Sequence, residues 1–232
     1  MRLFFGFLIG LALAVAVAAT AFKVAWGDIG EFEDRDRSAD EKRVVEAVDF
    51  TEIEIKGVFE LEVRVGDDYS VTLSGRREDL DRTRAHVESG RLVLDTEQKG
   101  EGRRISAVKR GVTAVVMLPA LDAIEIEGVV DADISGVNAD KFSADLSGVG
   151  EVDLSGVCVS FQAEISGIGE VDAKNLECQD VRVEVSGIGD TRIYASRSAD
   201  ADLTGIGRIE IYGSPANVSK TQTGPFGRIK VK

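Results

Sequence analysis

Carboxylate side chains are the groups in this sequence with the greatest capacity for chemistry. The 232 residues contain 41 Asp and Glu against 28 Lys and Arg, a formal net charge of −13. Asp133, Asp153 and Asp172 recur at near-constant spacing, and in stacked strands they would form one outward column. Like charges at strand spacing repel, so such a column either stays solvated or recruits a cation such as Ca²⁺. The three aspartates are candidate metal ligands, and a solvated surface is the favoured interpretation.

Catalytic chemistry has little support in the other residue types. His86 is the single histidine, and it lies in a polar stretch without a serine-centred elbow motif. A Ser-His-Asp or Cys-His arrangement would have to use it, so a solvated histidine is the favoured interpretation. With one histidine and two cysteines, a metal site rich in these residues is excluded. The sequence therefore predicts no catalytic residues and no cofactor.

A four-residue phrase, Ser/Thr-Gly-Val/Ile-Gly, recurs through the second half of the chain. Its glycines are Gly148 and Gly150, Gly167 and Gly169, Gly187 and Gly189, and Gly205 and Gly207. A fixed period near 20 residues is typical of one structural unit stacked on copies of itself. Glycine permits the positive φ or close backbone approach that a corner between two sheets requires. These glycines are expected at corners, and the residue between each pair, such as Ile168 or Ile188, is expected to point inward.

Strict alternation of apolar and polar residues flanks each glycine pair. Val152 and Leu154 follow Gly150 with acidic residues between them, and each repeat has equivalent positions. Ahead of the glycines, a second alternating stretch predicts another outward column, formed by Asp145, Glu164, Glu184 and Asp202. Each stretch reads as a short strand whose apolar face needs neighbouring coils to cover it. The predicted fold is all-β: a parallel β-helix, or β-solenoid, right-handed because parallel crossovers are right-handed.

Two tyrosines are the candidate ligand-binding residues. Tyr194 and Tyr212 occupy equivalent outward positions in successive repeats, in the column that also contains Ser155 and Lys174. Stacked strands would make the tyrosines exposed neighbours, a platform for a sugar ring or a partner's side chain. The alternative is an aromatic pair that covers the sheet surface.

The two cysteines, Cys158 and Cys178, lie at equivalent positions of successive repeats. They are expected in one column on adjacent coils, about 4.8 Å apart, which is within the Cα range of a disulfide. An exported protein meets an oxidising compartment, which favours the bond. Because Ala139 and Ser196 hold the same position in other repeats, two small buried residues are the alternative, and both interpretations stay open.

Residues 44–120 carry the same alternation with fewer glycines. One continuous stack over 44–232, with irregular early coils, is therefore expected. Strands are predicted at 69–73, 91–95 and 112–118. The polar segment 78–87 is interpreted as a short helical turn or loop, and 100–110 as an exposed loop.

The amino-terminal segment determines the compartment. Residues 3–22 carry no charge and Ala19-Thr20-Ala21 matches a signal-peptidase site, so a signal peptide over 1–21 is the favoured interpretation. An uncleaved membrane anchor over 3–22 is the alternative. Either one places the following residues outside the cytoplasm, in the periplasm or at the cell surface, behind a charged tether over 22–43.

Charge is distributed unevenly along the repeats. Residues 121–190 contain 16 acidic and 3 basic side chains, whereas residues 191–232 contain 3 acidic and 7 basic ones. The acidic part argues against nucleic acid and anionic membrane surfaces as partners, so a membrane contact is expected only through an uncleaved amino-terminal segment. Arg228, Lys230 and Lys232 in the last strand predict a blunted edge and a monomer or weak oligomer.

The segments 50–57, 90–94 and 115–128, together with the Ser-Gly-Ile-Gly repeats, resemble those of a bacterial family. Over about residues 44–230 the chain is similar to the putative auto-transporter adhesin, head GIN domain family, also described as a domain of unknown function. The resemblance implies an exported β-solenoid with a role in adhesion or surface binding, and it supplies no catalytic residues. No translocator barrel or wall-sorting tail precedes the last residue, Lys232, so self-export by this chain alone is not expected.

The predicted function is an exported, adhesin-like binding or scaffold module of the cell envelope without catalysis. Its partner would be a surface glycan or an envelope protein. The alternative is an envelope carbohydrate-active enzyme on a β-helix scaffold, because a fold alone does not exclude activity. Such enzymes interrupt the repeat with long loops and clustered bases, and the coils from 121 to 212 show no such interruption.

Overall fold

The computed structural model describes residues 40–96, 111–223 and 226–232. The predicted signal peptide or anchor, most of the tether and the loop predicted at 100–110 lie outside these ranges. Within them, no helix is both long enough and apolar enough to span a membrane.

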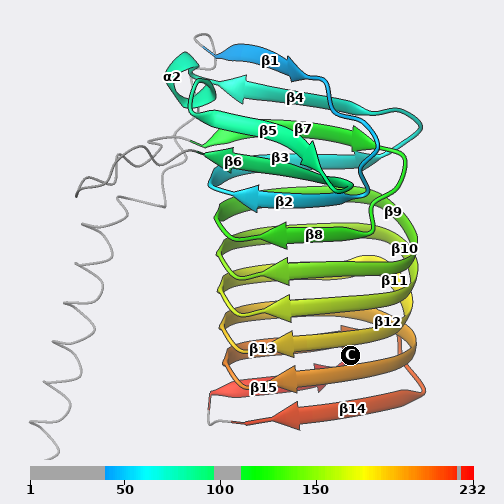
Figure 1. The fold of residues 1–232 in the computed structure, drawn as a ribbon. Helices are drawn as coiled ribbons and strands as arrows, with labels where there is room; N and C mark the ends of the chain where they lie inside the picture. The colour runs from blue at the N-terminus through cyan, green and yellow to red at the C-terminus, as the bar shows by residue number, and fades with distance from the viewer. Residues whose placement is uncertain (1–39, 97–110, 224–225) are drawn as a thin grey trace, which may run out of the picture. The chain divides into compact units, whose positions relative to one another are not determined.

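Four long, bent strands form the repeating part of the molecule (Figure 1). They are β9 (Val129–Leu146), β10 (Val149–Ile165), β11 (Ile168–Val185) and β12 (Ile188–Leu203). Each pairs in parallel with the next, and β10 and β11 stay paired from Val149 opposite Ile168 to Ile165 opposite Val185. Each strand runs through one sheet, bends and continues in a second sheet, so that one repeat makes one coil. The predicted β-solenoid is therefore confirmed.

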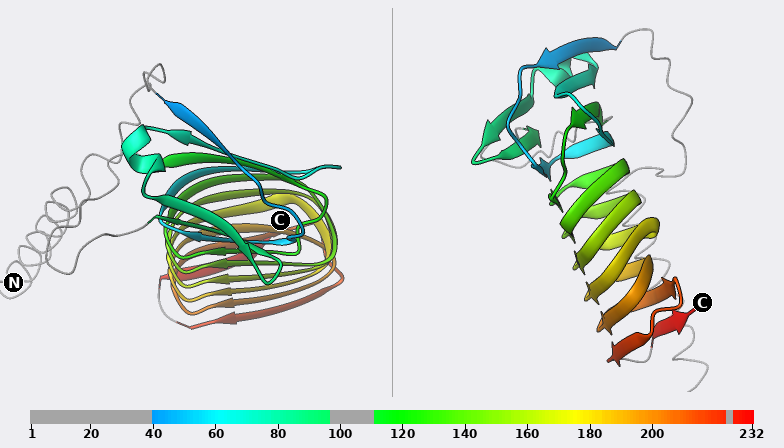
Figure 2. Two further views of the ribbon diagram at one scale, coloured as in Figure 1. Left: turned by 45° about the horizontal axis from the view of Figure 1, so that its top comes forward. Right: turned by 90° about the vertical axis from the view of Figure 1, so that its right-hand side faces the viewer.

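Two sheets face each other across the core. The back sheet, at the rear in Figure 1, joins the first halves of the long strands to β3 (Val58–Val65), β7 (Val112–Leu118), β13 (Ile206–Tyr212) and β15 (Gly227–Val231). The front sheet joins their second halves to β2 (Glu52–Lys56), β6 (Arg91–Thr96), β8 (Ala123–Ile126) and β14 (Asn217–Gln222). Figure 2 shows the coils as flattened loops stacked along one axis.

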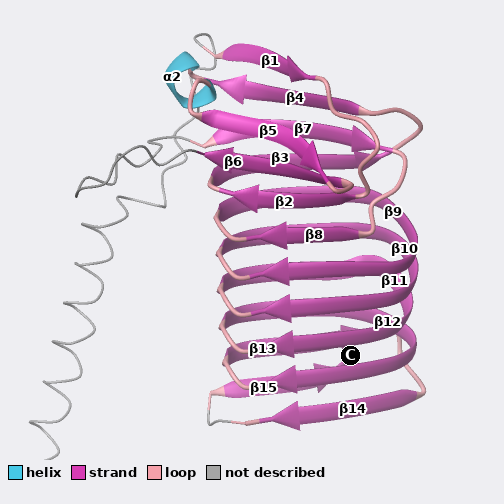
Figure 3. Ribbon diagram, in the orientation of Figure 1, coloured by secondary structure: helices cyan, strands magenta, loops and turns pink. Residues whose placement is uncertain are grey.

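The amino-terminal end of the stack departs from the parallel repeat. On the back sheet, β1 (Glu41–Val45) pairs antiparallel with β4 (Ser70–Gly75), and β4 pairs antiparallel with β7. On the front sheet, β5 (Thr83–Glu88) pairs antiparallel with β6. A single helical turn, α2 (Arg77–Leu80), drawn in cyan in Figure 3, lies between β4 and β5 in the chain. The irregular early coils expected from the sequence are thus antiparallel ribbons that finish the two sheets.

Two sequence-based assignments in this region need correction. Residues 83–87, interpreted as part of a short helical turn or loop, belong to β5, because Ala85 and Val87 pack in alternation against the core. Residues 41–43, assigned to the tether, belong to β1. The guanidinium of Arg43 donates to the carbonyl oxygens of Leu80 (2.9 Å) and Thr83 (2.6 Å), which ties β1 to the segment around α2.

Apolar side chains from both sheets fill the interior in the alternation that the sequence predicted. Val152, Leu154, Val171 and Ile193 are at most 3% exposed. Phe142 and Phe161, on adjacent coils, stack with their ring centroids 5.6 Å apart. Since burial of a Leu, Ile or Phe side chain contributes about 1.5–3 kcal/mol, this continuous column is the main source of stability.

Glycine is required at the corner because adjacent coils approach closely there. A Cβ atom on Gly150 would lie 2.0 Å from the carbonyl oxygen of Val130, and one on Gly167 would lie 1.9 Å from that of Gly148. The other repeat glycines face the same contact with the preceding coil, at 2.0 Å or less: Gly148, Gly169, Gly187, Gly189, Gly205 and Gly207. The obstacle is backbone, which cannot rotate away as a side chain can. Only glycine therefore leaves enough space for adjacent coils to stack at these positions.

The residue between the two glycines points outward, so the expectation that it points inward was wrong. Ile168 and Ile188 are each 49% exposed, and Ile206 is 48% exposed. These residues already belong to the back-sheet strand, and alternation counted back from buried Val171 gives Gly169 the inward position and Ile168 the outward one. An aliphatic column consequently lies on the surface.

Cys158 and Cys178 are joined by a disulfide with a Cα–Cα distance of 4.5 Å. They are register partners on β10 and β11, and both are buried. The bond links consecutive coils near the bend between the two sheets. Of the two interpretations that the sequence left open, the structure contains the bonded one.

Candidate functional site

A column of carboxylates follows the outer face of the front sheet. Glu125, Asp145, Glu164, Glu184 and Asp202 come from β8, β9, β10, β11 and β12, and each is in register with the next. The column exists because every one of these residues alternates with a buried apolar neighbour, such as Leu146 beside Asp145. The sequence predicted four of its members, from Asp145 to Asp202, and the structure adds Glu125.

A hydroxyl column lies beside the carboxylates, two residues further along the chain toward the glycine corner. Its members are Ser147, Ser166, Ser186 and Thr204. Two hollows open over the carboxylate column, one of about 250 Å³ and one of about 400 Å³, and the hydroxyl column lines the larger one. Both are lined by Glu125, Asp145 and Glu164, so they adjoin over β8, β9 and β10. We call the two hollows together the front groove.

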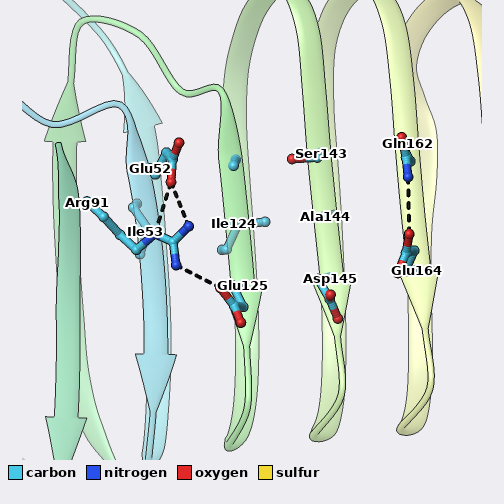
Figure 4. A pocket seen from close by; sticks show the side chains of 11 residues that line it. Glu52, Ile53, Arg91, Ile124, Glu125, Ser143, Ala144, Asp145, Gln162 and Glu164 are labelled. Atoms are coloured by element: carbon cyan, nitrogen blue, oxygen red, sulfur yellow. Dashed lines mark hydrogen bonds and ion pairs between the residues drawn. The ribbon is translucent and has the colours of Figure 1, made fainter. Parts of the chain in front are cut away.

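Arg91 closes the amino-terminal end of the front groove (Figure 4). Its Nε donates to Glu52 Oε2 and its Nη1 donates to Glu125 Oε2, both at 2.9 Å. The hydrogen bond to Glu52 is the main reason that the pKa of Arg91 is raised. At the other end, Arg182 Nη1 donates to Asp200 Oδ2 at 3.0 Å and Arg182 also pairs with Glu184. Guanidinium groups thus neutralise the ends of the groove.

The middle of the groove is less compensated. Burial raises the pKa of Asp145, and the charges of Glu164 and Glu127 raise it further. Glu164 accepts a hydrogen bond from Gln162 at 3.1 Å, as Figure 4 shows. The groove is therefore a strip of hydrogen-bond acceptors and hydroxyl donors with a negative centre.

Three glutamates beside the groove form a cluster that the sequence interpretation missed. Oxygen atoms of Glu54, Glu125 and Glu127 lie within 4.8 Å of one another. Lys56 pairs with Glu54 and lies 4.0 Å from Glu127, and Arg91 lies 3.8 Å from Glu54. These two bases already occupy the position that a cation would take. The signal was present in the sequence, because Ile-Glu-Ile stretches at 53–55 and 124–126 place Glu54 and Glu125 in one column.

The aspartates predicted as candidate metal ligands are neighbours on the back sheet. Asp133, Asp153 and Asp172 are consecutive register partners. Asp172 is only 8% exposed and is held by Lys174 Nζ at 2.5 Å and by Arg192 Nη1 at 3.3 Å. A metal role for the three stays a prediction, and a metal at Asp172 would have to displace these two bases.

Tyr194 and Tyr212 are register partners on β12 and β13, as the sequence predicted. Both are half-buried, and the Tyr212 hydroxyl donates to Glu210 at 3.0 Å. The rest of the predicted column is wrong: Ser155 lies opposite Asn175, and Tyr194 lies opposite Glu177. The reason is an irregularity of β11 between Ala173 and Glu177, where extra residues interrupt the register.

His86 lies on β5, where its Nε2 is 3.9 Å from an oxygen of Glu88. Its side chain is 53% exposed. The imidazole is therefore a solvated group at the irregular end of the front sheet, as the sequence analysis favoured. It is separate from the residues that line the front groove.

The fold and its outward columns define a class of protein: an all-β solenoid in which each coil presents the same side-chain positions on each face. The model of the family "Putative auto-transporter adhesin, head GIN domain" matches residues 49–215, and the chain belongs to this family. The resemblance seen in the sequence is confirmed. No match was found among curated proteins.

Solved structures show the same fold. A putative adhesin from Bacteroides fragilis is 21% identical with a TM-score of 0.63, over 83% of this chain and 97% of that one. A putative adhesin from Parabacteroides distasonis is 14% identical with a TM-score of 0.50, over 83% and 97% of the two chains. At these identities the likeness extends to the fold. The description of the family as putative adhesins is consistent with a binding module.

Proposed function

We propose that this protein is an exported binding module of the cell envelope that holds an extended glycan along the front groove. The observation that carries the proposal is the groove itself, in which successive coils present one carboxylate and one hydroxyl at the same positions. A periodic row of polar groups suits a ligand that is itself a periodic chain. The proposal fits the description of the family as adhesins.

The groove chemistry selects among glycans. Carboxylate oxygens accept hydrogen bonds from sugar hydroxyl or ammonium groups, and Ser and Thr hydroxyls both donate and accept. The carboxylates from Asp145 to Asp202 give the groove a negative field, which repels anionic polymers. The expected ligand is therefore a neutral or amino-bearing polysaccharide of the envelope.

Export is part of the proposal. An adhesin-like module acts in the periplasm or at the cell surface, and the amino-terminal segment predicted as a signal peptide or anchor would place it there. A second role as a carbohydrate-active enzyme has no specific support in the groove. Its carboxylates repeat from coil to coil, so none is distinguished as an acid or a base.

The test is binding of the purified protein to immobilised glycans, grouped as neutral, amino-bearing and anionic. The paired change Glu164→Gln and Glu184→Gln should weaken binding about tenfold or more, because each removes a hydrogen bond to a charged acceptor. The matched control is Asp131→Asn with Asp133→Asn, which makes the same charge change on the back sheet. Equal loss in both variants, or a preference for anionic glycans, would refute the proposal. Hydrolysis of a bound glycan would instead establish the enzyme alternative.

A further inference from the structure

A column of partly to largely exposed apolar side chains, which we call the aliphatic column after its Val and Ile members, crosses the back sheet from β9 to β15 beside the glycine corner. Its members are Val129, Val149, Ile168, Ile188, Ile206 and Phe226. Phe226 belongs to it because Gly207 and Gly227 are register partners, and Phe226 and Ile206 precede them. The three isoleucines are about half exposed and Phe226 is 71% exposed. A soluble protein seldom presents so continuous an apolar row unless something covers it.

Two charged columns lie beside the aliphatic one, and their sign changes along the coil axis. Asp131 and Asp133 on β9 and Glu151 and Asp153 on β10 are exposed and form no salt bridge with any described residue. The equivalent positions on β15 are Arg228 and Lys230, which also lack a salt bridge within the described ranges. The part of the back sheet from β9 to β15, which the aliphatic column crosses, is therefore acidic at its β9 end and basic at its β15 end.

The coils between these ends are internally neutralised. Arg192 on β12 pairs with Glu170 and Asp172 of β11, and Arg208 on β13 pairs with Asp190 of β12 at 2.5 Å. The uncompensated charge is thus confined to the two ends of the aliphatic column. A partner that satisfied this surface would need the opposite charge order along an apolar row of the same length.

A second copy of the chain, turned end for end, has that order. We propose that two copies associate through their back sheets in antiparallel orientation, around a two-fold axis that runs parallel to the strands between β11 and β12. This axis places β9 opposite β15 and β10 opposite β13. Asp131 and Asp133 then face Arg228 and Lys230 of the second copy, and Ile168 faces Ile188 across the centre.

The two-fold operation keeps each column opposite itself, so the aliphatic columns meet along their whole length. A two-fold interface is self-complementary in this way by necessity. The acidic end of each chain meets the basic end of the other twice, once at each end of the interface. A parallel face-to-face arrangement would place like charges together and is disfavoured.

The size of the surface predicts a weak, salt-sensitive dimer. Six strands at about 4.8 Å and five residues at about 3.3 Å give roughly 450–500 Å² per chain. Stable interfaces bury about 800 Å² per partner. Charge attraction supplements a small apolar contact here, and salt screens exposed charges. The front groove lies on the opposite sheet and stays accessible in the dimer.

The experiment is sedimentation equilibrium of the protein at about 50 mM and about 500 mM NaCl, with two charge-reversal variants. One carries Asp131→Lys and Asp133→Lys, and the other carries Arg228→Glu and Lys230→Glu. Each alone should weaken dimerisation at least about tenfold at low salt. An equimolar mixture of the two should form a heterodimer, because one back sheet is then basic at both ends and the other acidic at both ends. The four changes in one chain should restore the homodimer.

Two further variants distinguish association through the back sheet from association through the ends of the stack. Ile188→Asp, at an exposed position that leaves the core intact, should abolish dimerisation, whereas end-to-end stacking would be unaffected by it. Glu164→Lys with Glu184→Lys makes the same charge change on the front sheet and should leave dimerisation unchanged. A protein that stays monomeric at about 1 mM in low salt would overturn the proposal. So would association that persists unchanged in both charge-reversal variants, or a mixture that forms no heterodimer.

Discussion

Asp153 and Asp172 occupy the same outward column one coil apart, yet their surroundings differ. Burial raises the pKa of Asp153, and the charges of Asp172 and Asp133 raise it further. For Asp172, burial also acts to raise the pKa, but hydrogen bonds from the Lys174 side chain and backbone, with the charge of Arg192, outweigh it and lower the pKa. The repeat places both aspartates in the column, whereas the bases beside Asp172, Lys174 and Arg192, are departures from the repeat. A carboxylate column is therefore stabilising only where a coil breaks the pattern.

Removal of the paired carboxylate, Asp172, is expected to have the largest effect on the free energy of unfolding. Asp172→Asn should destabilise the protein by about 1–3 kcal/mol, because it leaves Lys174 and Arg192 without a charged acceptor near the core. Asp153→Asn should be neutral or stabilising by about 0.5 kcal/mol, since it relieves repulsion between like charges. Urea unfolding with the disulfide intact measures both. Equal effects at the two positions would show that the pairing around Asp172 contributes nothing to stability.

The difference between the two aspartates can also be reduced by adding a base next to Asp153. Asp133→Arg places a guanidinium beside Asp153, as Arg192 lies beside Asp172. The change should stabilise the protein by about 0.5 kcal/mol and lower the pKa of Asp153. Asp133→Asn is the control that removes the charge without adding a partner. NMR titration of Asp153 should show a lower pKa in the Arg variant than in the Asn variant, and identical values would contradict the explanation.

The smallest expected effect is on the pH dependence of stability. Asp145, Glu151 and Asp153 have folded-state pKa values raised first by burial and then by neighbouring carboxylates. A raised pKa means that the folded state binds protons more readily, so stability rises as the pH falls from 7 through these values. The melting temperature should therefore increase modestly as the pH falls from 7 toward the ordinary carboxylate range near 4.

At still lower pH, stability decreases as the pH falls. The pKa of Asp180 is lowered to about 2 by hydrogen bonds from Arg197 and Ser198. Its contribution is complete above the unfolded value near 4 and is lost as the pH falls toward 2. Calorimetry should thus find a maximum in mildly acidic buffer. The triple variant Asp145→Asn, Glu151→Gln, Asp153→Asn should lack the rise in melting temperature on acidification, and an unaltered rise would exclude these three groups as its cause.

The periodicity of the sequence was enough to predict most of the fold. Alternation correctly assigned the buried faces around Val152 and Val171 and the outward column from Asp145 to Asp202, because both depend on contacts that repeat every coil. The error at Ile168 arose because this residue was assigned to the corner, whereas it is the first residue of β11 and follows the alternation of that strand.

The parts of the site that the sequence did not predict depend on unique contacts. Arg91, on β6, reaches Glu52 and Glu125 because β2 pairs with β6 on one side and with β8 on the other, an order that does not follow the order of the strands in the sequence. The irregularity after Ala173 likewise moves Tyr194 out of its expected column. Neither feature repeats from coil to coil, so the sequence pattern could not predict it.

The disulfide between Cys158 and Cys178 has a consequence for how the molecule comes apart. A stack of coils held by nearest-neighbour contacts can unzip from a free end, one coil at a time. The bond clamps β10 to β11 in the interior of the stack, so fraying that starts at β15 meets a covalent stop before it reaches the upper coils. Under tension along the coil axis, the coils on the carboxyl-terminal side of the bond can peel away while β10 and β11 remain linked.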